Sequence, residues 1–157
     1  MKDLPLGAFI SITYRSYFVR INHRMKYLGL SAGQFFVLMV LSNEQGITQD
    51  YLAGVLLIDK GSIARAVNVL EQKGIVRRIT DENNRRAVRL YLTEAGEKLI
   101  PDVVKIDSEC EEAAFSGLTE EERKQARTLL CKISENSYQA AYENVDKKWK
   151  EFPLKGL

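Results

Sequence analysis

The 157-residue sequence has little of what metal and redox chemistry require. Its one histidine, His23, excludes a metal site built from several histidines and a proton relay between two of them. We expect His23 to be an ordinary polar position on a helix. Two cysteines, Cys110 and Cys131, lack metal-ligand spacing, and we expect both to be buried structural thiols. No glycine-rich phosphate loop or nucleophile motif is present. The expectation is therefore no enzyme, no catalytic residue, no metal and no cofactor.

The sequence also lacks a long apolar run. No stretch approaches the ~20 apolar residues needed to cross a bilayer, and the N-terminal segment is interrupted by Tyr14, Arg15 and Arg20. We expect a cytoplasmic, unprocessed protein with no membrane partner. Because 45% of the residues are apolar and 28% are charged, the disordered and fibrous classes are excluded. The length suits a single domain over residues 1–157.

The net charge is only +2, but the charges are distributed unevenly. Residues 60–92 contain eight cations and three anions, a net charge of +5, whereas residues 93–122 contain two cations and ten anions, a net charge of −8. A basic segment followed by an acidic one favours a phosphate-facing module joined to a scaffold that points away from the phosphates. Solvated charge on helix surfaces is the alternative for any single residue.

Apolar periodicity predicts three helices in the N-terminal third. Residues 5–28 carry apolar side chains at three- and four-residue steps, which is the pattern of a long amphipathic helix. Ser31 and Gln34 have the spacing of a capping box, in which each side chain satisfies a free backbone donor of the other. The run 35–41 that follows is apolar nearly all round and predicts a buried helix. Thr48 is the expected N-cap of a short third helix.

The helix predicted for residues 60–73 is decisive for function. One face is apolar at helical spacing and should pack on the preceding helix: Ile63, Ala66, Val67 and Leu70. The remaining surface carries short donors and acceptors with one guanidinium, and the candidate DNA-binding residues on it are Lys60, Gly61, Ser62, Arg65 and Asn68. Such a set suits base edges and phosphates in a major groove about 12 Å wide. An ordinary solvated helix face is the alternative. Asp59 is the expected N-cap.

Two strands are predicted over residues 75–80 and 87–92, joined by a polar tip. Every second residue of the later strand is apolar, as expected when one face is buried: Val88, Leu90 and Leu92. The tip carries Arg85 and Arg86, and guanidinium groups are attracted by the negative potential of a minor groove. A solvated loop in which these arginines pair with Asp81 or Glu82 is the alternative. Together the elements predict a mainly α fold with a small β-wing, a winged helix-turn-helix.

Three segments carry a more specific likeness. LSAGQFFVLMVL, LEQKGIVRR and RRAVRLYLTEAG resemble the multiple-antibiotic-resistance regulator (MarR) family over about residues 30–100. The resemblance implies a winged helix-turn-helix DNA-binding core at 30–100, flanked by dimerisation helices at 5–28 and 93–152. It implies a homodimer whose subunits each read half of a pseudo-palindromic operator in double-stranded DNA. Family members commonly repress transcription, and many release DNA on binding small phenolic or aromatic anions.

The wing departs from the family pattern at one position. The family wing usually reads Asp-x-Arg, whereas this chain has Asn84 at the Asp position and Arg86 at the Arg position. An amide there keeps a hydrogen-bonding partner for the arginine but removes a charge. We expect tighter and less selective attraction to phosphates than an aspartate would give.

The C-terminal part should contribute to a dimer. Thr119 begins a second capping box, and the helix after it carries a mostly apolar stripe that includes Leu129 and Leu130. So long a helix has too little of its own chain to pack against, and pairing with a second copy is the simplest solution. A fold-back onto residues 5–28 is the alternative that would cover much of the stripe.

An effector site is a further hypothesis drawn from the family. Pockets in the family lie between the winged helix and the dimer helices, and the residues that could supply aromatic walls and a cation for a carboxylate are Tyr14, Arg15, Tyr17, Phe18 and Phe36. Core packing is the alternative for each of these aromatics. A second function class also stays open, a winged helix used only for protein contact without DNA binding. Cations on both the helix face and the wing favour the DNA-binding class.

Overall fold

The computed structural model describes residues 3–81 and 87–142. Its elements in chain order are α1 (Leu6–Met25), η1 (Lys26–Leu28), α2 (Ala32–Asn43), β1 (Ile47–Thr48), α3 (Gln49–Leu56), α4 (Lys60–Gln72), β2 (Val76–Thr80), β3 (Val88–Leu92), α5 (Glu94–Ala114) and α6 (Glu120–Ala141). The strands form one antiparallel sheet in the order β1-β3-β2. The predicted fold class, mainly α-helical with a small β-wing, is confirmed.

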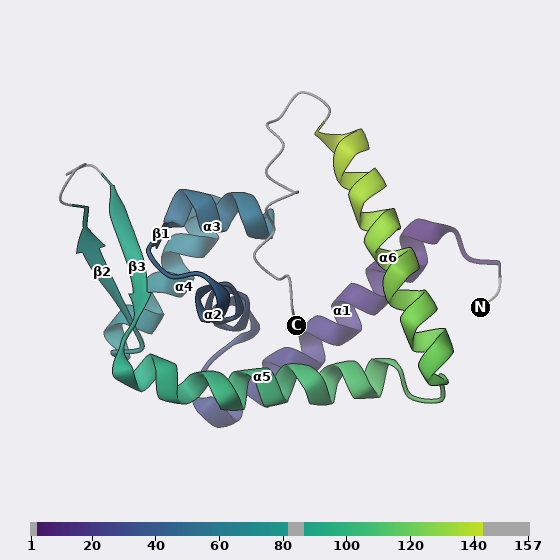
Figure 1. Cartoon of the computed structure of the whole chain (residues 1–157), viewed down its shortest axis with the longest axis horizontal. Coiled ribbons are helices and arrows are strands. Elements are labelled where there is room, and N and C mark those ends of the chain that lie inside the picture. The colour runs from purple at the N-terminus through teal and green to yellow at the C-terminus, as the bar shows by residue number, and fades with distance from the viewer. Residues whose placement is uncertain (1–2, 82–86, 143–157) are drawn as a thin grey trace.

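The winged helix-turn-helix and the long terminal helices occupy opposite ends of the molecule. Figure 1 shows the sheet with α3 and α4 at one end, α1 and α6 toward the other, and α5 running along one edge between them. Helix α2 lies in the middle, where it packs on α1, α4 and α5. This arrangement leaves α4 and the β2–β3 hairpin far from α6.

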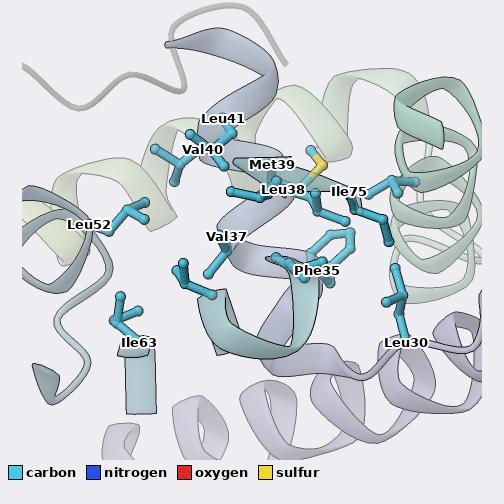
Figure 2. Close-up of a cluster of buried hydrophobic side chains, with 14 of the residues drawn as sticks. Leu30, Phe35, Val37, Leu38, Met39, Val40, Leu41, Leu52, Ile63 and Ile75 are labelled. Atoms are coloured by element: carbon cyan, nitrogen blue, oxygen red, sulfur yellow. The ribbon is translucent and has the colours of Figure 1, made fainter. Parts of the chain in front are cut away.

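The hydrophobic core is built around α2 (Figure 2). Most of its side chains are buried. Apolar side chains from other parts of the chain surround them: Leu30, Leu52, Ile63 and Ile75. A helix that is apolar nearly all round is stable only where neighbours enclose it, which confirms the prediction of a buried helix. Among the described residues no single helix is long and apolar enough to cross a membrane, although α1–η1 and α2, bent by 82°, meet the length and composition criteria as a pair.

Local side-chain caps determine where the helices begin. Ser31 and Gln34 form the predicted capping box of α2. Thr48 caps α3 and Asp59 caps α4, each by accepting a hydrogen bond from a backbone N–H three residues ahead. Thr119 forms the second box at the start of α6. These caps confirm the helix starts expected from sequence.

The junction between β3 and α5 holds the sheet against the long helix. The backbone N–H of Thr93 donates to the carbonyl of Ile75 at 3.0 Å, and its hydroxyl donates to the carbonyl of Gly74 at 2.5 Å. Gly96 lies in the first turn of α5, close to the Ile75 carbonyl. A Cβ at position 96 would stand 2.2 Å from the Ile75 oxygen. Only glycine permits this approach, because no other residue lacks a Cβ.

Two burial predictions are wrong. Val88 is 37% exposed, because β1 is only two residues long and pairs with Leu90 and Arg89, so neither β1 nor the core reaches Val88. Cys131 is exposed on α6, whereas Cys110 is buried between α5 and α1, as expected. Burial raises the pKa of the Cys110 thiol, and the nearby Arg20 opposes this effect.

Helix α6 buries none of its 22 residues in the described chain. Leu129 is 58% exposed and Leu130 is 50% exposed, so a fold-back onto α1 does not cover this stripe. The N-terminal half of α1 also exposes apolar side chains, with Leu6 58% exposed and Ile12 49% exposed. Two neighbouring helices therefore present apolar surface that one copy of the chain leaves in contact with water.

Candidate nucleic-acid interface

The N-terminal end of α4 is held by ionic contacts at its first turn. The carboxylate of Asp59 accepts a hydrogen bond from the backbone N–H of Ser62 at 2.8 Å. Hydrogen bonds from the side chain and the backbone of Ser62, with a smaller contribution from Arg65, lower the pKa of Asp59. Lys60 pairs with Asp50 of α3 at 2.9 Å between exposed side chains. The two helices of the helix-turn-helix are thus joined at the end where a duplex would approach.

The structure brings the candidate residues of α4 together on one exposed face. Lys60, Gly61, Arg65 and Asn68 are exposed, and Ser62 is half-buried. Arg65 donates to the Ser62 hydroxyl at 2.7 Å, so its guanidinium lies along the first two turns of the helix. A Cβ on Gly61 would stand 3.2 Å from Asp59 and 3.4 Å from Arg65. This face therefore offers a compact group of hydrogen-bond donors with one fixed arginine.

Arg78 of β2 joins the sheet to the exposed face of α4. One guanidinium nitrogen, Nη2, donates to the side-chain oxygen of Asn68 at 2.6 Å, and the other, Nη1, forms an ion pair with Glu71. Sequence reasoning counted Arg78 only as part of the basic segment. Nothing in the local sequence indicates the contact, because it depends on β2 passing beside the last turns of α4.

The base of the wing is fixed by a second arginine. The guanidinium of Arg89 on β3 donates to the Asp81 carboxylate at 2.5 Å and to the carbonyl oxygen of Gly46 at 2.7 Å. The hydrogen bond to Asp81 raises the pKa of Arg89. These contacts tie both strands of the hairpin to the segment before β1. The predicted wing contacts Arg85 and Arg86, together with Asn84, lie outside the described residues.

Three of the five candidate effector residues gather beside a pocket of about 750 Å³ between α1, α3 and α6. Tyr14 and Phe36 line the pocket, and Phe18 lies between them with ring-centroid distances of 5.9 and 6.3 Å. The rest of the lining is mainly apolar or hydroxyl-bearing: Ile10, Val55, Leu56, Leu57, Ile58, Ser134, Ser137, Tyr138 and Tyr142. The volume falls within the range of small-molecule sites, about 300–1,000 Å³.

The remaining two candidates lie elsewhere. Arg15 is exposed and is not among the residues that line the pocket. Tyr17 turns toward α5, where its hydroxyl donates to the Asp107 carboxylate at 2.7 Å. Burial and the hydrogen bond to Asp107 raise the pKa of Tyr17, and burial raises the pKa of Asp107 although the Tyr17 hydrogen bond lowers it. The pocket therefore has the predicted aromatic walls, but the predicted cation, Arg15, does not line it.

Residues 3–81 and 87–142 contain no candidate metal-binding site. No group of three or more histidine, cysteine, aspartate or glutamate side chains in this part of the chain could hold a metal ion. The lone His23 is exposed on α1 and packs edge-on against Tyr27, with ring centroids 5.9 Å apart. It occupies the ordinary polar helix position that the sequence predicted.

Comparisons with known proteins agree with this geometry. Residues 30–88 match a family model described as MarR family. The chain is 31% identical over 135 residues to an uncharacterized HTH-type transcriptional regulator, YybA, of Bacillus subtilis (strain 168), covering 86% of this chain and 84% of that protein. It is similar to the crystal structure of a MarR transcriptional regulator from Methanosarcina mazei Go1, with a TM-score of 0.82 and 40% identity over 86% of this chain and 97% of that one.

A further similar structure was solved as a complex. It is that of a MarR family transcriptional regulator from Listeria monocytogenes complexed with 26mer DNA. The TM-score is 0.79 and the identity 27%, with 92% of this chain and 98% of that chain covered. All three of these relatives are described as transcriptional regulators.

Proposed function

The chain belongs to the MarR family of transcriptional regulators, and on that premise we propose that it binds double-stranded DNA as a homodimeric repressor. Each subunit would place α4 in the major groove of one half of a pseudo-palindromic operator. The wing would contact the neighbouring phosphates or minor groove through Arg85 and Arg86.

The exposed polar face of α4 is the observation that carries this proposal. The apolar side of α4 is buried in the core through Ile63, Val67 and Leu70, so only the opposite, polar side is accessible to a partner. That side holds hydrogen-bond donors and Arg65 but no exposed large apolar side chain. Protein-contact surfaces usually have an apolar centre, whereas duplex-contact surfaces are polar and positively charged.

The relative from Listeria monocytogenes supports the DNA partner. That protein was crystallised with a 26mer DNA, and its structure matches 92% of this chain with a TM-score of 0.79. A duplex of that length spans more than two turns of B-DNA, enough for two half-sites one helical turn apart. We infer the same kind of partner for this chain.

The homodimer is supported by the helices that one copy leaves unpacked. Helix α6 buries no residue, and it exposes Leu129 and Leu130 beside the apolar N-terminal half of α1. Exposed apolar surface of this extent is unusual for a monomer and is typical of an interface. A second copy would cover the helices by a symmetric contact, and the two α4 helices would then be related by a two-fold axis.

Release by a small aromatic ligand is the regulatory part of the proposal. The pocket beside Tyr14, Phe18 and Phe36 lies between α3 of the winged helix and α6 of the long helices. A ligand bound there would change the spacing of the two DNA-binding units only if it binds the DNA-competent and the DNA-free arrangement of the dimer with different affinity. Because the described lining contains no cation, a neutral phenol should bind better than an aromatic carboxylate.

Salt-dependent binding to a random duplex tests the DNA-binding function. Wild type should bind non-specifically with an affinity that falls steeply as salt increases, since phosphate contacts release counterions. Arg65→Ala should reduce the slope of log affinity against log salt by about 1 if Arg65 contacts a phosphate. Arg127→Ala, which removes a cation at the far end of the molecule on α6, is the matched control and should leave the slope unchanged. Absence of salt-dependent binding would favour a protein-contact module instead.

A further inference from the structure

Arg78 donates a hydrogen bond to the side chain of Asn68 on the exposed face of α4, and we propose that this contact determines which base Asn68 reads, favouring guanine over adenine. The inference rests on the proposed function, because base reading requires that α4 lie against a duplex. Arg78 itself would be a positioning residue, acting on DNA through the Asn68 amide.

The Arg78 guanidinium is held at two points. Nη2 donates to Oδ1 of Asn68 at 2.6 Å, and Nη1 is paired with the carboxylate of Glu71. The Arg78 side chain is only 22% exposed. Since its charge is balanced by Glu71 and its donors are directed at α4, Arg78 is poorly placed to serve as a phosphate contact. Its role is to fix the neighbouring side chains of α4.

The contact fixes the orientation of the Asn68 amide. A guanidinium only donates hydrogen bonds, so the amide atom that faces Arg78 must be the oxygen. The amide nitrogen Nδ2 is attached to the same planar carbon and is therefore turned away from Arg78. Within residues 3–81 and 87–142, no protein acceptor is found for Nδ2 among the hydrogen bonds of Asn68. The exposed end of the side chain thus presents N–H donors.

An Asn68 amide held by Arg78 and a freely rotating amide should prefer different bases in the major groove. Adenine is read by an asparagine whose oxygen accepts from N6 while its nitrogen donates to N7. Guanine presents two acceptors, N7 and O6. With its oxygen turned toward Arg78, Asn68 presents its N–H groups to the groove. Guanine offers these groups acceptors at both N7 and O6, whereas adenine offers a donor at N6 that they cannot pair with. The Arg78 contact therefore changes the preferred base from adenine to guanine.

Selection of bound sequences from a random duplex library with the full chain tests the inference. Asn68→Ala identifies the base pair that Asn68 reads, as the one position where selectivity is lost. At that position wild type should prefer guanine over adenine by about tenfold, within the discrimination of one good side-chain contact. Arg78→Met should free the amide and reverse the preference toward adenine. An unchanged preference in Arg78→Met, or no position affected by Asn68→Ala, would overturn the inference.

Two matched variants separate positioning from loss of charge. Arg77→Met removes the adjacent cation on the same strand, whose guanidinium lies 5.9 Å over the Tyr91 ring and does not touch Asn68. Glu71→Gln breaks the ion pair of Arg78 but leaves its donor to Asn68. Both should retain the guanine preference, and a shift to adenine in Arg77→Met would contradict the inference. Failure of wild type to select any duplex would instead overturn the proposed function, and the inference with it.

A measurement on unaltered Arg78 keeps the test valid if Arg78→Met does not fold. Replacing the contacted guanine by 7-deazaguanine removes the N7 acceptor. Wild-type binding should weaken by about fivefold, and Asn68→Ala binding should not change. Equal binding of wild type to the two duplexes would overturn the inference.

Discussion

Gly96 lies in the first turn of α5 against the backbone that leads into β2, and its replacement by alanine should destabilise the fold. A Cβ at this position would stand 2.2 Å from the carbonyl oxygen of Ile75 and 3.2 Å from its carbonyl carbon. The oxygen cannot move away freely, because it accepts a hydrogen bond from the backbone N–H of Thr93 at 3.0 Å and lies 3.2 Å from the Thr93 hydroxyl oxygen. Either α5 or the Ile75 peptide must therefore shift.

Opposing effects determine the magnitude. Overpacking costs about 1–3 kcal/mol, and weakening one Thr93 hydrogen bond costs about 1 kcal/mol. Alanine gains about 1 kcal/mol over glycine in a helix. The steric effect is larger, so Gly96→Ala should lower the free energy of unfolding by about 1–3 kcal/mol. For a chain of this length the Tm should fall by roughly 2–12 °C.

Gly54 in α3 provides the matched control. It is exposed, and a Cβ there would have nothing within 4 Å. Only helix propensity remains, so Gly54→Ala should stabilise the protein by up to about 1 kcal/mol. Urea unfolding followed by circular dichroism, at one fixed protein concentration, measures both variants. The reasoning is refuted if Gly96→Ala is as stable as wild type or if the two variants shift stability in the same direction.

Three other perturbations test the wing, the dimer and the half-buried carboxyl of Asp107. Asn84→Asp should lower DNA affinity and flatten its salt dependence, and unchanged binding across salt in a shift assay would count against the expected role of the amide. Leu129→Glu should raise the dimer dissociation constant at least about tenfold in analytical ultracentrifugation, whereas a monomeric wild type would contradict the dimer. Burial raises the pKa of Asp107, so its contribution to stability is present below about pH 4 and is lost as pH rises through the raised pKa. Asp107→Asn, which keeps an acceptor for the Tyr17 hydroxyl, should flatten that part of the unfolding pH profile; an unchanged profile would exclude this role.

Helix boundaries could be predicted from sequence because the signals are local. Thr48 and Asp59 each cap a helix through a backbone N–H three residues ahead, so the donor and the acceptor lie in one short stretch of sequence. The apolar run of α2 likewise identified the central core helix without knowledge of its partners. The α4 face that carries Arg65 followed from helical spacing alone.

Contacts between elements could not be predicted in the same way. The bond from Arg78 to Asn68 depends on how β2 passes α4, and the two residues of β1 have no periodicity of their own. Val88 followed the alternation of a buried strand face, but burial requires a covering element as well as a pattern. The aromatic character of Tyr17 and Phe18 predicts one shared site, but adjacent helix positions point in different directions and Tyr17 faces α5.

The outward side chains of α4 have lost much of their rotational freedom before any partner arrives. Arg65 is held by Ser62, and the amide of Asn68 is held by Arg78. Immobilising such a side chain during association would cost about 0.5–1.5 kcal/mol of rotamer entropy. Here that entropy is lost when the chain folds. A surface with fixed side chains adapts little to a mismatched DNA sequence, so a mismatch should weaken binding mainly through lost contact enthalpy. For the matched DNA sequence, calorimetry should show only a small entropic penalty of binding.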